Sequence, residues 1–376
     1  MKRLAVIPSD PIKEYFKKGF SSNWLKDYYN PGHFFDEVYL LSDLEDAGQE
    51  ESIGVKSVHT TGKTFAKTLK ELKIDLVRAY GGNWACALAC GHKVPGIPVV
   101  VSVHDPSLQR IYDPIKRADI VLCVSEEVKK AVAVKFKRPE RTWLLSNRVD
   151  LENMRPYSTK ETEHLDKTYP YRYKIVHVGR RSREKNLDTL IRALAILGNE
   201  YCVIAIGQGD TKVYQDLAQQ EGVASRVFLI DSVPHEQLGH YFSFSDCFCT
   251  PSRWEGFGVV FIEALACEAM VVTSNIAPLN EYMVNNQNSL LVKEFEDPRV
   301  LAEAICKACT DNDLRKIIKK NARGSVKKFE KKAIEQQEAD YYKKILGMNS
   351  KGEFENTLGQ SLRQGIRGLL RQGRSN

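Results

Sequence analysis

The sequence lacks the features that mark membrane-spanning and secreted proteins. No apolar run among its 376 residues approaches the ~18 that a transmembrane helix requires. The chain has no Asn-x-Ser/Thr glycosylation site, and its nine cysteines are an odd number. The apolar part of residues 1–8 is too short for a signal peptide and is typical of a first β-strand. We therefore predict a cytoplasmic protein in a reducing compartment.

A strong excess of charge of one sign is also missing. The net charge is +7, and the sequence contains no DNA- or RNA-binding motif, so nucleic acid is not a predicted partner. A modest positive charge fits an enzyme for anionic substrates, or a protein that visits an anionic membrane surface.

Apolar, strand-like runs alternate with helical patterns, which predicts an α/β protein with parallel sheets of βαβ units. A chain of this length is expected to form two domains. The polar segment 151–173 has no clear periodicity and is interpreted as the interdomain linker. The expected strands are 4–8, 37–41, 55–59, 74–80, 98–103, 120–124, 142–145, 174–178, 201–206, 227–230, 247–250, 270–273 and 289–292.

The most informative segment is 254–263, in which two carboxylates flank a Gly-x-Gly turn. Glu255 lies in the loop before the turn, and Glu263 falls about two turns into the helix that follows. At ~1.5 Å rise per residue the two side chains are on the order of 10 Å apart. That is roughly the distance from the hexose to the ribose of a nucleotide diphosphate sugar. The free amides of the helix N-terminus between them suit a pyrophosphate.

A second segment supplies positive charge. The strand at 174–178 runs into Gly179, and Arg180 and Lys185 follow in the loop before the next helix. An arginine and a lysine five positions apart can place two cations at a diphosphate. His104 directly follows the strand 98–103, at a strand end that would face a cleft between two such sheets.

In these segments the sequence resembles the retaining glycosyltransferases of family 4, which have the GT-B architecture of two facing Rossmann-like domains. The resemblance runs in family order from about residue 75 to 342. It rests on the segments 103–105, 123–126, 146–150, 179–185, 206–210 and 255–263.

The resemblance implies a role for each candidate residue. Glu263 would bind the donor's ribose, and Glu255 would lie at the sugar ring. Arg180 and Lys185 would hold the diphosphate and stabilise its charge as it leaves, with Arg181 and Arg183 as competitors. The implied catalytic set is Glu255, His104, Arg180 and Lys185, and the implied donor-binding set is Glu263, Gly256, Phe257, Gly258, Gly179, Val233 and Gly19.

The sequence departs from the family pattern at three places. The usual Gly-Gly pair near the end of the first strand is absent, which weakens the assignment of Gly19 as a phosphate loop residue. Arg148 stands where the family commonly has glycine. Asn186 replaces the usual glycine after the lysine, a mild change because asparagine tolerates left-handed geometry.

The expected domains are an N-terminal acceptor-binding domain at 1–160 and a C-terminal nucleotide-sugar-binding domain at 161–328. A helix at 329–346 would cross back to the first domain, and 347–376 would form a basic amphipathic tail. A helix of that kind can lie on an anionic bilayer; the alternative is a frayed or self-packed terminal helix. Its apolar stripe and its basic residues are Leu358, Leu362, Ile366, Leu369, Leu370, Arg363, Arg367, Arg371 and Arg374.

The predicted function is transfer of a hexose from a nucleotide diphosphate sugar to an acceptor hydroxyl, with retained anomeric configuration, in surface polysaccharide or glycolipid synthesis. No cofactor and no metal are expected, because no Asp-x-Asp pair stands where a metal would be needed. Val233 is expected to border the pocket for the base, but no residue near it distinguishes uracil from guanine. The family default therefore ranks the expected donors: a UDP-sugar first and GDP-mannose next. The sequence does not decide whether the tail at 347–376 contacts the inner face of the membrane. The alternatives are a non-catalytic GT-B scaffold that binds a nucleotide or glycan, and a nucleotide-sugar epimerase.

Overall fold

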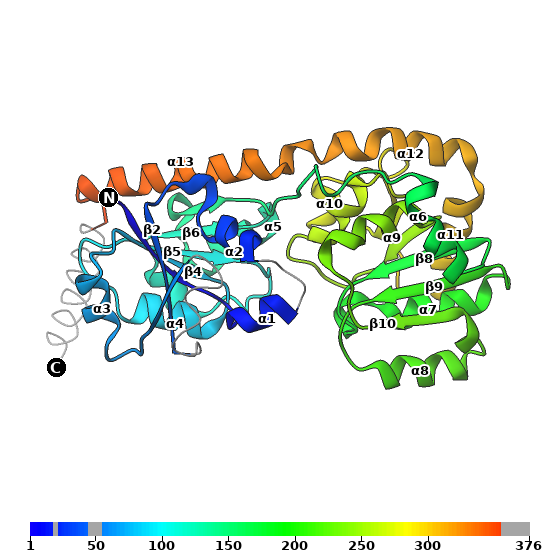
Figure 1. The fold of residues 1–376 in the computed structure, drawn as a ribbon, viewed down its shortest axis with the longest axis horizontal. Helices are drawn as coiled ribbons and strands as arrows, with labels where there is room; N and C mark the ends of the chain where they lie inside the picture. Colours follow the sequence, from blue (N-terminus) through cyan, green and yellow to red (C-terminus); the bar gives the residue numbers. More distant parts are fainter. Residues whose placement is uncertain (18–21, 44–54, 355–376) are drawn as a thin grey trace, which may run out of the picture.

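The computed structural model describes residues 1–17, 22–43 and 55–354. Within these residues the strands pair in parallel and form two sheets, each in its own α/β domain (Figure 1). This is the predicted α/β class and GT-B architecture, and every expected strand range contains a strand. Among the described helices, none combines the length and the apolar character that a membrane crossing requires.

The first domain contains, in its described part, a seven-stranded sheet of order β3-β2-β1-β4-β5-β6-β7. Its strands are β1 Arg3–Ile7, β2 Glu37–Ser42, β3 Lys56–His59, β4 Leu76–Tyr80, β5 Val99–Val103, β6 Ile120–Cys123 and β7 Thr142–Leu144. Its helices are α1 Ile12–Lys17, α2 Ser22–Tyr29, α3 Phe65–Glu71, α4 Asn83–Gly91 and α5 Glu126–Phe136.

The second domain contains a six-stranded sheet of order β10-β9-β8-β11-β12-β13 among the described residues. Its strands are β8 Tyr173–Val178, β9 Tyr201–Ile206, β10 Val227–Ile230, β11 Cys247–Thr250, β12 Val271–Ser274 and β13 Leu290–Val292. Its helices are α6 Thr159–Thr168, α7 Leu187–Ile196, α8 Thr211–Gln220, α9 Leu238–Phe244, α10 Val259–Ala266, α11 Pro298–Thr310 and α12 Asn312–Ser325.

Most of the strands are largely apolar because helices cover both faces of each sheet, whereas the edge strand β3, with the sequence KSVH, is polar and partly exposed. In β1, Leu4 and Val6 pack in one hydrophobic cluster, whereas Ala5 and Ile7 pack in another on the opposite face. This alternation is the two-residue period of a β-strand. The first cluster also contains residues of α2 and of the last helix, α13 (Lys331–Ser350), and the second contains residues of α3 and α4.

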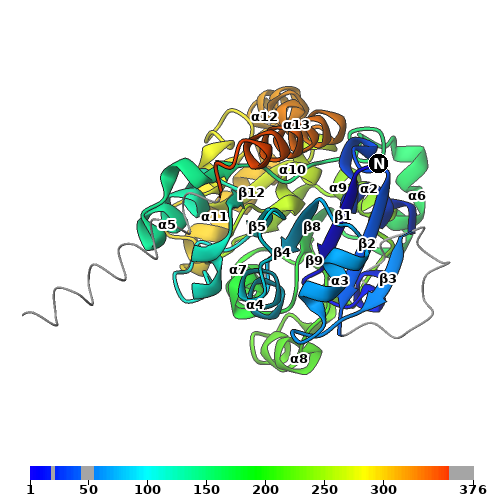
Figure 2. The same ribbon diagram turned by 90° about the vertical axis from the view of Figure 1, so that its left-hand side faces the viewer.

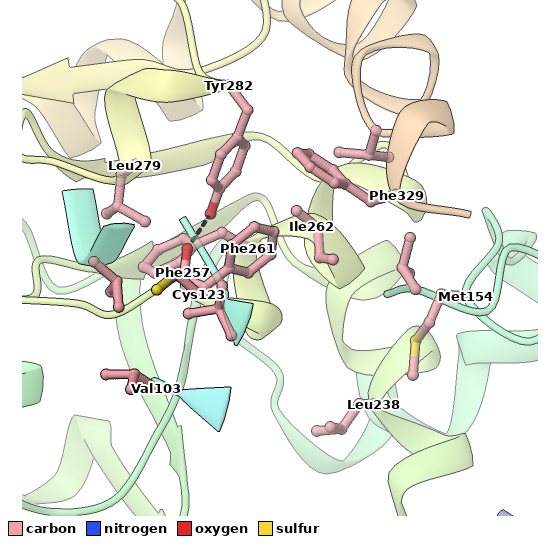
Figure 3. Packing of buried hydrophobic residues seen from close by; sticks show 14 of the residues in the cluster. Val103, Cys123, Met154, Leu238, Phe257, Phe261, Ile262, Leu279, Tyr282 and Phe329 are labelled. Atoms are coloured by element: carbon pink, nitrogen blue, oxygen red, sulfur yellow. Dashed lines mark hydrogen bonds between the residues drawn. The ribbon is translucent and has the colours of Figure 1, made fainter. Parts of the chain in front are cut away.

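One hydrophobic cluster is shared by the two domains. Val103 and Cys123, at the ends of β5 and β6, belong to the same cluster as Phe257 and Phe261 of the second domain. Figure 3 shows these side chains together with Tyr282 and Phe329. The two sheets are therefore joined by apolar packing at the carboxyl ends of their strands.

The segment expected to be the linker is partly helical. Within 151–173, α6 begins at Thr159 after a capping box in which Ser158 and Glu161 bond each other's backbone amides. Only Thr162 and Leu165 of α6 are buried, so its apolar stripe is too short to stand out in the sequence. The predicted domain limit at 160/161 falls in the first turn of this helix and stays a prediction.

Helix α13 lies along the first domain, after α12 has run along the second (Figures 1 and 2). It begins at Lys331 after Glu330, whose carboxylate caps the amide of Ala333, and it ends at Ser350, beyond the predicted end at 346. Near that end the Asn349 side chain donates to Gly96 O at 2.7 Å, which ties the added turn to the first domain. The apolar stripe predicted at 358–370 lies outside the described residues.

Two charged residues are buried where α13 meets β4. Arg78 and Glu338 are 2% and 4% exposed, and Arg78 Nε lies 3.3 Å from Glu338 Oε1 and 3.1 Å from Tyr342 Oη. Arg148, in the loop after β7, adds a second guanidinium 3.6 Å from the other Glu338 oxygen. The C-terminal helix thus supplies the counter-charge for two arginines of the first domain.

We expect Glu338→Ala to lower the free energy of unfolding by about 3–5 kcal/mol, because it leaves buried guanidinium charge without its carboxylate. The matched control is Glu152→Ala, which removes an exposed pair with Lys332 at 3.0 Å and should leave the free energy of unfolding close to that of wild type. Urea unfolding of both variants measures the difference. Equal losses would show that Glu338 does not stabilise the buried arginines.

Candidate active site

A cleft of about 410 Å³ lies between the two domains, at the carboxyl ends of their strands. The first domain contributes residues that follow β5 and β7, and the second contributes the loops after β8 and β11 with the start of α10. The lining residues are His104, Asp105, Arg110, Asn147, Val178, Gly179, Arg180, Glu184, Lys185, Trp254, Glu255, Gly256, Phe257, Gly258, Val259 and Val260.

Residues 255–258, the last part of the loop between β11 and α10, are called here the Gly256 loop. Glu255 is 5% exposed, and the loop ends at Gly258, whose φ of +85° is left-handed. A Cβ at Gly258 would lie 2.6 Å from the Phe261 ring. Both the left-handed backbone and the lack of space therefore require glycine at this position. Helix α10 begins at the next residue, and its first amides have no partner within the helix.

Gly256 brings the backbones of the two domains into contact. A Cβ at this position would lie 1.7 Å from the carbonyl oxygen of His104. The Gly256 carbonyl in turn accepts a hydrogen bond from Ser125 Oγ at 2.8 Å. No side chain other than hydrogen fits between the Gly256 loop and the end of β5.

The predicted cations and carboxylates come together as an alternating set, the charge array of Arg180, Glu184, Lys185 and Glu255. Lys185 Nζ lies 2.6 Å from Glu255 Oε1 and 3.2 Å from Glu184 Oε1. Arg180 Nη2 lies 3.2 Å from Glu184 Oε2, and its side chain is 71% exposed. Both cations therefore reach the cleft, and each is paired with a carboxylate there.

The competing arginines do not line the cleft. Arg181 is buried, and its guanidinium donates to Ile230 O at 3.1 Å and Thr211 Oγ1 at 2.8 Å and pairs with Asp231. Arg183 uses its carbonyl to accept from Arg253 Nη1 at 2.7 Å. Both residues hold the loop after β8 in place, which leaves Arg180 and Lys185 as its cleft-facing cations.

His104 lies at the end of β5, as predicted, and borders the cleft from the first domain. Its Nε2 is 3.0 Å from Ser102 Oγ. The side chain is exposed to the cleft, but the protein atoms crowded around the ring and, to a smaller extent, the charge of Arg78 lower the pKa of His104 below its ordinary value. The ring is therefore neutral at physiological pH and can hydrogen-bond a hydroxyl without carrying charge.

Glu263 does not line the same cleft. It lies on α10, is 6% exposed, and its Oε1 is 2.8 Å from His235 Nε2. Burial lowers the pKa of His235, but the Glu263 carboxylate and its hydrogen bond outweigh that effect and raise the pKa above its ordinary value. Val233 lies two residues before this histidine and packs against the shared hydrophobic cluster. Gly19 lies outside the described residues.

The two described departures from the family pattern have local explanations. Asn186 has φ 57° and ψ 34°, the left-handed geometry that glycine would adopt, and its side chain donates to Pro251 O at 2.9 Å. Arg148 is turned away from solvent toward α13 and lies over the Tyr28 ring, with 4.9 Å from guanidinium carbon to ring centroid. It serves the buried charges beneath His104 and does not line the cleft.

Several residues of the site were not predicted. Ser252 Oγ donates to Glu255 Oε1 at 2.8 Å, and Glu184 pairs with both cations of the charge array. Asp105, directly after His104, accepts a hydrogen bond from the Ser107 amide and also pairs with Arg110 at 2.8 Å. A serine three positions before Glu255 and an acid beside Lys185 were the signals in the sequence that could have predicted them.

Within the described residues, no three His, Cys, Asp or Glu side chains form a group able to hold a metal ion.

Comparison with known proteins agrees with this geometry. The family described as "Glycosyl transferases group 1" matches residues 162–325, and "Glycosyltransferase Family 4" matches 56–153. Together they cover more than half of the chain, in family order. The chain belongs to glycosyltransferase family 4.

Relatives of this family 4 glycosyltransferase are distant. An uncharacterized glycosyltransferase of Methanocaldococcus jannaschii is 24% identical over 68% of this chain and 71% of its own length. The N-acetylgalactosamine-N,N'-diacetylbacillosaminyl-diphospho-undecaprenol 4-alpha-N-acetylgalactosaminyltransferase of Campylobacter jejuni is 29% identical over 61% of each chain. The crystal structure of Anabaena HepE with UDP-glucose covers 92% of this chain and all of its own, with a TM-score of 0.78 and 18% identity. At that identity the likeness shows the GT-B fold alone.

We expect Gly256→Ala to force the two domains of this glycosyltransferase apart, because the added methyl group would overlap the His104 carbonyl. Small-angle X-ray scattering should show a larger radius of gyration than in wild type. The control is Gly324→Ala in α12, where an added Cβ meets nothing within 4 Å. An unchanged radius in both variants would mean that the contact at Gly256 does not set the domain spacing.

The pair of His235 and Glu263 predicts a pH dependence of stability. Because the pKa of His235 is raised by folding, the stabilisation is complete below its unfolded pKa of ~6.5 and is lost as pH rises through the folded pKa. The difference in melting temperature between wild type and His235→Gln should therefore shrink from pH 5.5 to pH 8.5. A difference that is constant over this range would contradict the ion pair.

Proposed function

We propose that this glycosyltransferase moves a hexose from a nucleotide diphosphate sugar to an acceptor hydroxyl, with retained anomeric configuration and without a metal ion. The observation that carries the proposal is the convergence of Arg180, Lys185 and Glu255 on the free amides at the start of α10. A UDP-sugar is the first candidate donor and GDP-mannose the next.

The charge array and the helix amides would bind the diphosphate. As the bond from the anomeric carbon to the phosphate breaks, negative charge builds on the leaving oxygen, where two cations and the helix dipole stabilise it. To reach the phosphates, Lys185 exchanges its bond with Glu255 for one with the donor. Glu255 is then free to accept a hydrogen bond from the sugar. These cations supply the positive charge that a divalent ion supplies in other transferases.

Retention follows if the acceptor attacks from the face that the phosphate leaves. The bond from acceptor oxygen to anomeric carbon forms as the bond to phosphate breaks, and the acceptor's proton passes to the departing phosphate oxygen. His104, neutral and on the opposite wall of the cleft, would hydrogen-bond the transferred sugar. The close contact of the two domains at Gly256 would limit the access of water from this side, so that the acceptor and not solvent captures the sugar.

The acceptor would bind the first domain and belong to a surface polysaccharide or a glycolipid. The Campylobacter relative acts, by its name, on a diphospho-undecaprenol-linked substrate. The basic, apolar pattern of residues 347–376 suits contact with an anionic membrane at the inner face. The rival function is a non-catalytic GT-B scaffold, which the missing Gly-Gly pair near the first strand favours. Turnover of the donor separates the two.

The proposal is tested first by a thermal-shift panel of UDP, GDP, ADP and dTDP with their sugars, in EDTA, on wild type and Glu263→Ala. One nucleotide at 100 times its Kd should stabilise wild type by about 2.7 kcal/mol. The shift should survive EDTA. It should disappear in Glu263→Ala, because this carboxylate, one step beyond the cleft on α10, would bind the ribose, and it should persist in Glu303→Ala, which removes an exposed acid on α11. No shift with any nucleotide would favour the scaffold. With a donor in hand, an NMR spectrum showing an inverted anomeric centre would refute retention.

A further inference from the structure

One segment of the second domain touches both the Gly256 loop and the first domain without lining the cleft. It comprises the short helix η7, Leu279–Glu281, and Tyr282, and is called here the connector. Leu279 packs beneath the loop, so that a Cβ on Gly258 would lie 2.8 Å from its side chain. Neither Glu281 nor Tyr282 is among the residues that line the cleft.

Tyr282 holds the Gly256 loop from behind. Its hydroxyl lies 2.8 Å from Phe257 O and 3.2 Å from Gly258 O, and its ring stacks on Phe257 with 5.5 Å between centroids (Figure 3). The side chain is 6% exposed, and burial raises the pKa of its hydroxyl well above the usual value. Tyr282 is therefore a permanent hydrogen-bond donor to this loop.

These two bonds fix the direction of the cleft-facing amides. In a planar trans peptide the N–H points opposite to the C=O of the same unit. Because the carbonyls of Phe257 and Gly258 point toward Tyr282, the amides of Gly258 and Val259 point the opposite way. Both residues line the cleft. The tyrosine thus orients the donors that would meet a diphosphate, without touching it.

Glu281 joins the connector to the first domain. Its two carboxylate oxygens accept hydrogen bonds from the amides of Glu126 and Glu127, at 3.1 and 2.9 Å. These are first-turn amides of α5, where the helix dipole favours negative charge. The residue before them, Ser125, is the N-cap of α5 and donates to Gly256 O. One helix end in the first domain therefore holds both the connector and the Gly256 loop.

We infer that Glu281 and Tyr282 are positioning residues for sugar transfer: Tyr282 aims the amides of the Gly256 loop, and Glu281 sets that loop against the first domain. The inference rests on the proposed function, in which the donor binds the second domain and the acceptor the first. Their reacting atoms then meet only if the two domains are held in register, and small misplacements reduce the rate steeply.

The two residues have different expected effects. Tyr282→Phe removes the two hydrogen bonds to the Gly256 loop and keeps the stacked ring, so the amides are no longer aimed and the Kd for UDP should rise about tenfold. Glu281→Ala leaves the donor site intact but loosens the domain contact. UDP binding should stay within about twofold of wild type while the kcat for UDP-glucose turnover falls about tenfold. Glu281→Gln, which keeps an acceptor oxygen, should recover part of that loss.

The matched controls lie in the second domain, away from the cleft. Tyr171→Phe removes a hydroxyl that donates to Ser225 O at 2.9 Å, and Glu303→Ala removes an exposed carboxylate. Both should bind UDP and turn over UDP-glucose as wild type does. A Tyr282→Phe protein with wild-type UDP affinity would overturn the role of Tyr282. A Glu281→Ala protein with unchanged kcat, or with UDP affinity and kcat lowered together, would overturn that of Glu281.

Hydrogen–deuterium exchange separates a failure of this inference from a failure of the proposed function. Without any ligand, exchange should rise at 258–262 in Tyr282→Phe and at 126–127 in Glu281→Ala. If wild type binds no nucleotide, the proposed donor is wrong, and increased exchange at these sites still supports the connector. Unchanged exchange in both variants would overturn it.

Discussion

The carbonyl of His104 lies so close to Gly256 that the main chains of the two domains touch, and the rest of the cleft is arranged around that point. Each sheet has its own core, yet Val103 and Cys123 share a hydrophobic cluster with Phe257 and Phe261 beside this contact. The neutral ring of His104 and the start of α10 are consequently held on facing walls of the cleft. A side chain at position 256 would therefore push the two walls of the cleft apart.

The C-terminal helix imposes a second constraint. Helix α13 follows both sheets in the chain and belongs to neither, but its buried Glu338 balances Arg78 and Arg148 in a small cavity that His104 also lines. Tyr342 of the same helix completes the hydrogen bonds of Arg78. The buried arginines of the first domain therefore gain their counter-charge only from a helix that follows the second domain in the chain.

Much of this architecture could be predicted because buried parallel strands are continuous apolar runs, as β6 and β9 are. The candidate site could be predicted in part: Glu255, Arg180, Lys185 and His104 do meet in one cleft. Helix α6 was missed because only two of its residues are buried. The partnerships of Ser125 with Gly256 and of Glu281 with α5 join residues more than a hundred positions apart. No local pattern records such a pairing.

The charge array also bears on which anions the cleft retains. Arg180 and Lys185 are neutralised by Glu184 and Glu255, so the cleft is a set of closed ion pairs and not an open positive surface. An anion must compete with two carboxylates for these cations, and a small inorganic phosphate can contact only a few groups of the cleft at once. A ligand that spans the loop, the helix start and the opposite wall adds contacts that the carboxylates do not oppose. The built-in counter-ions therefore act as a filter for size, and they are ready to reclaim the cations when a product leaves.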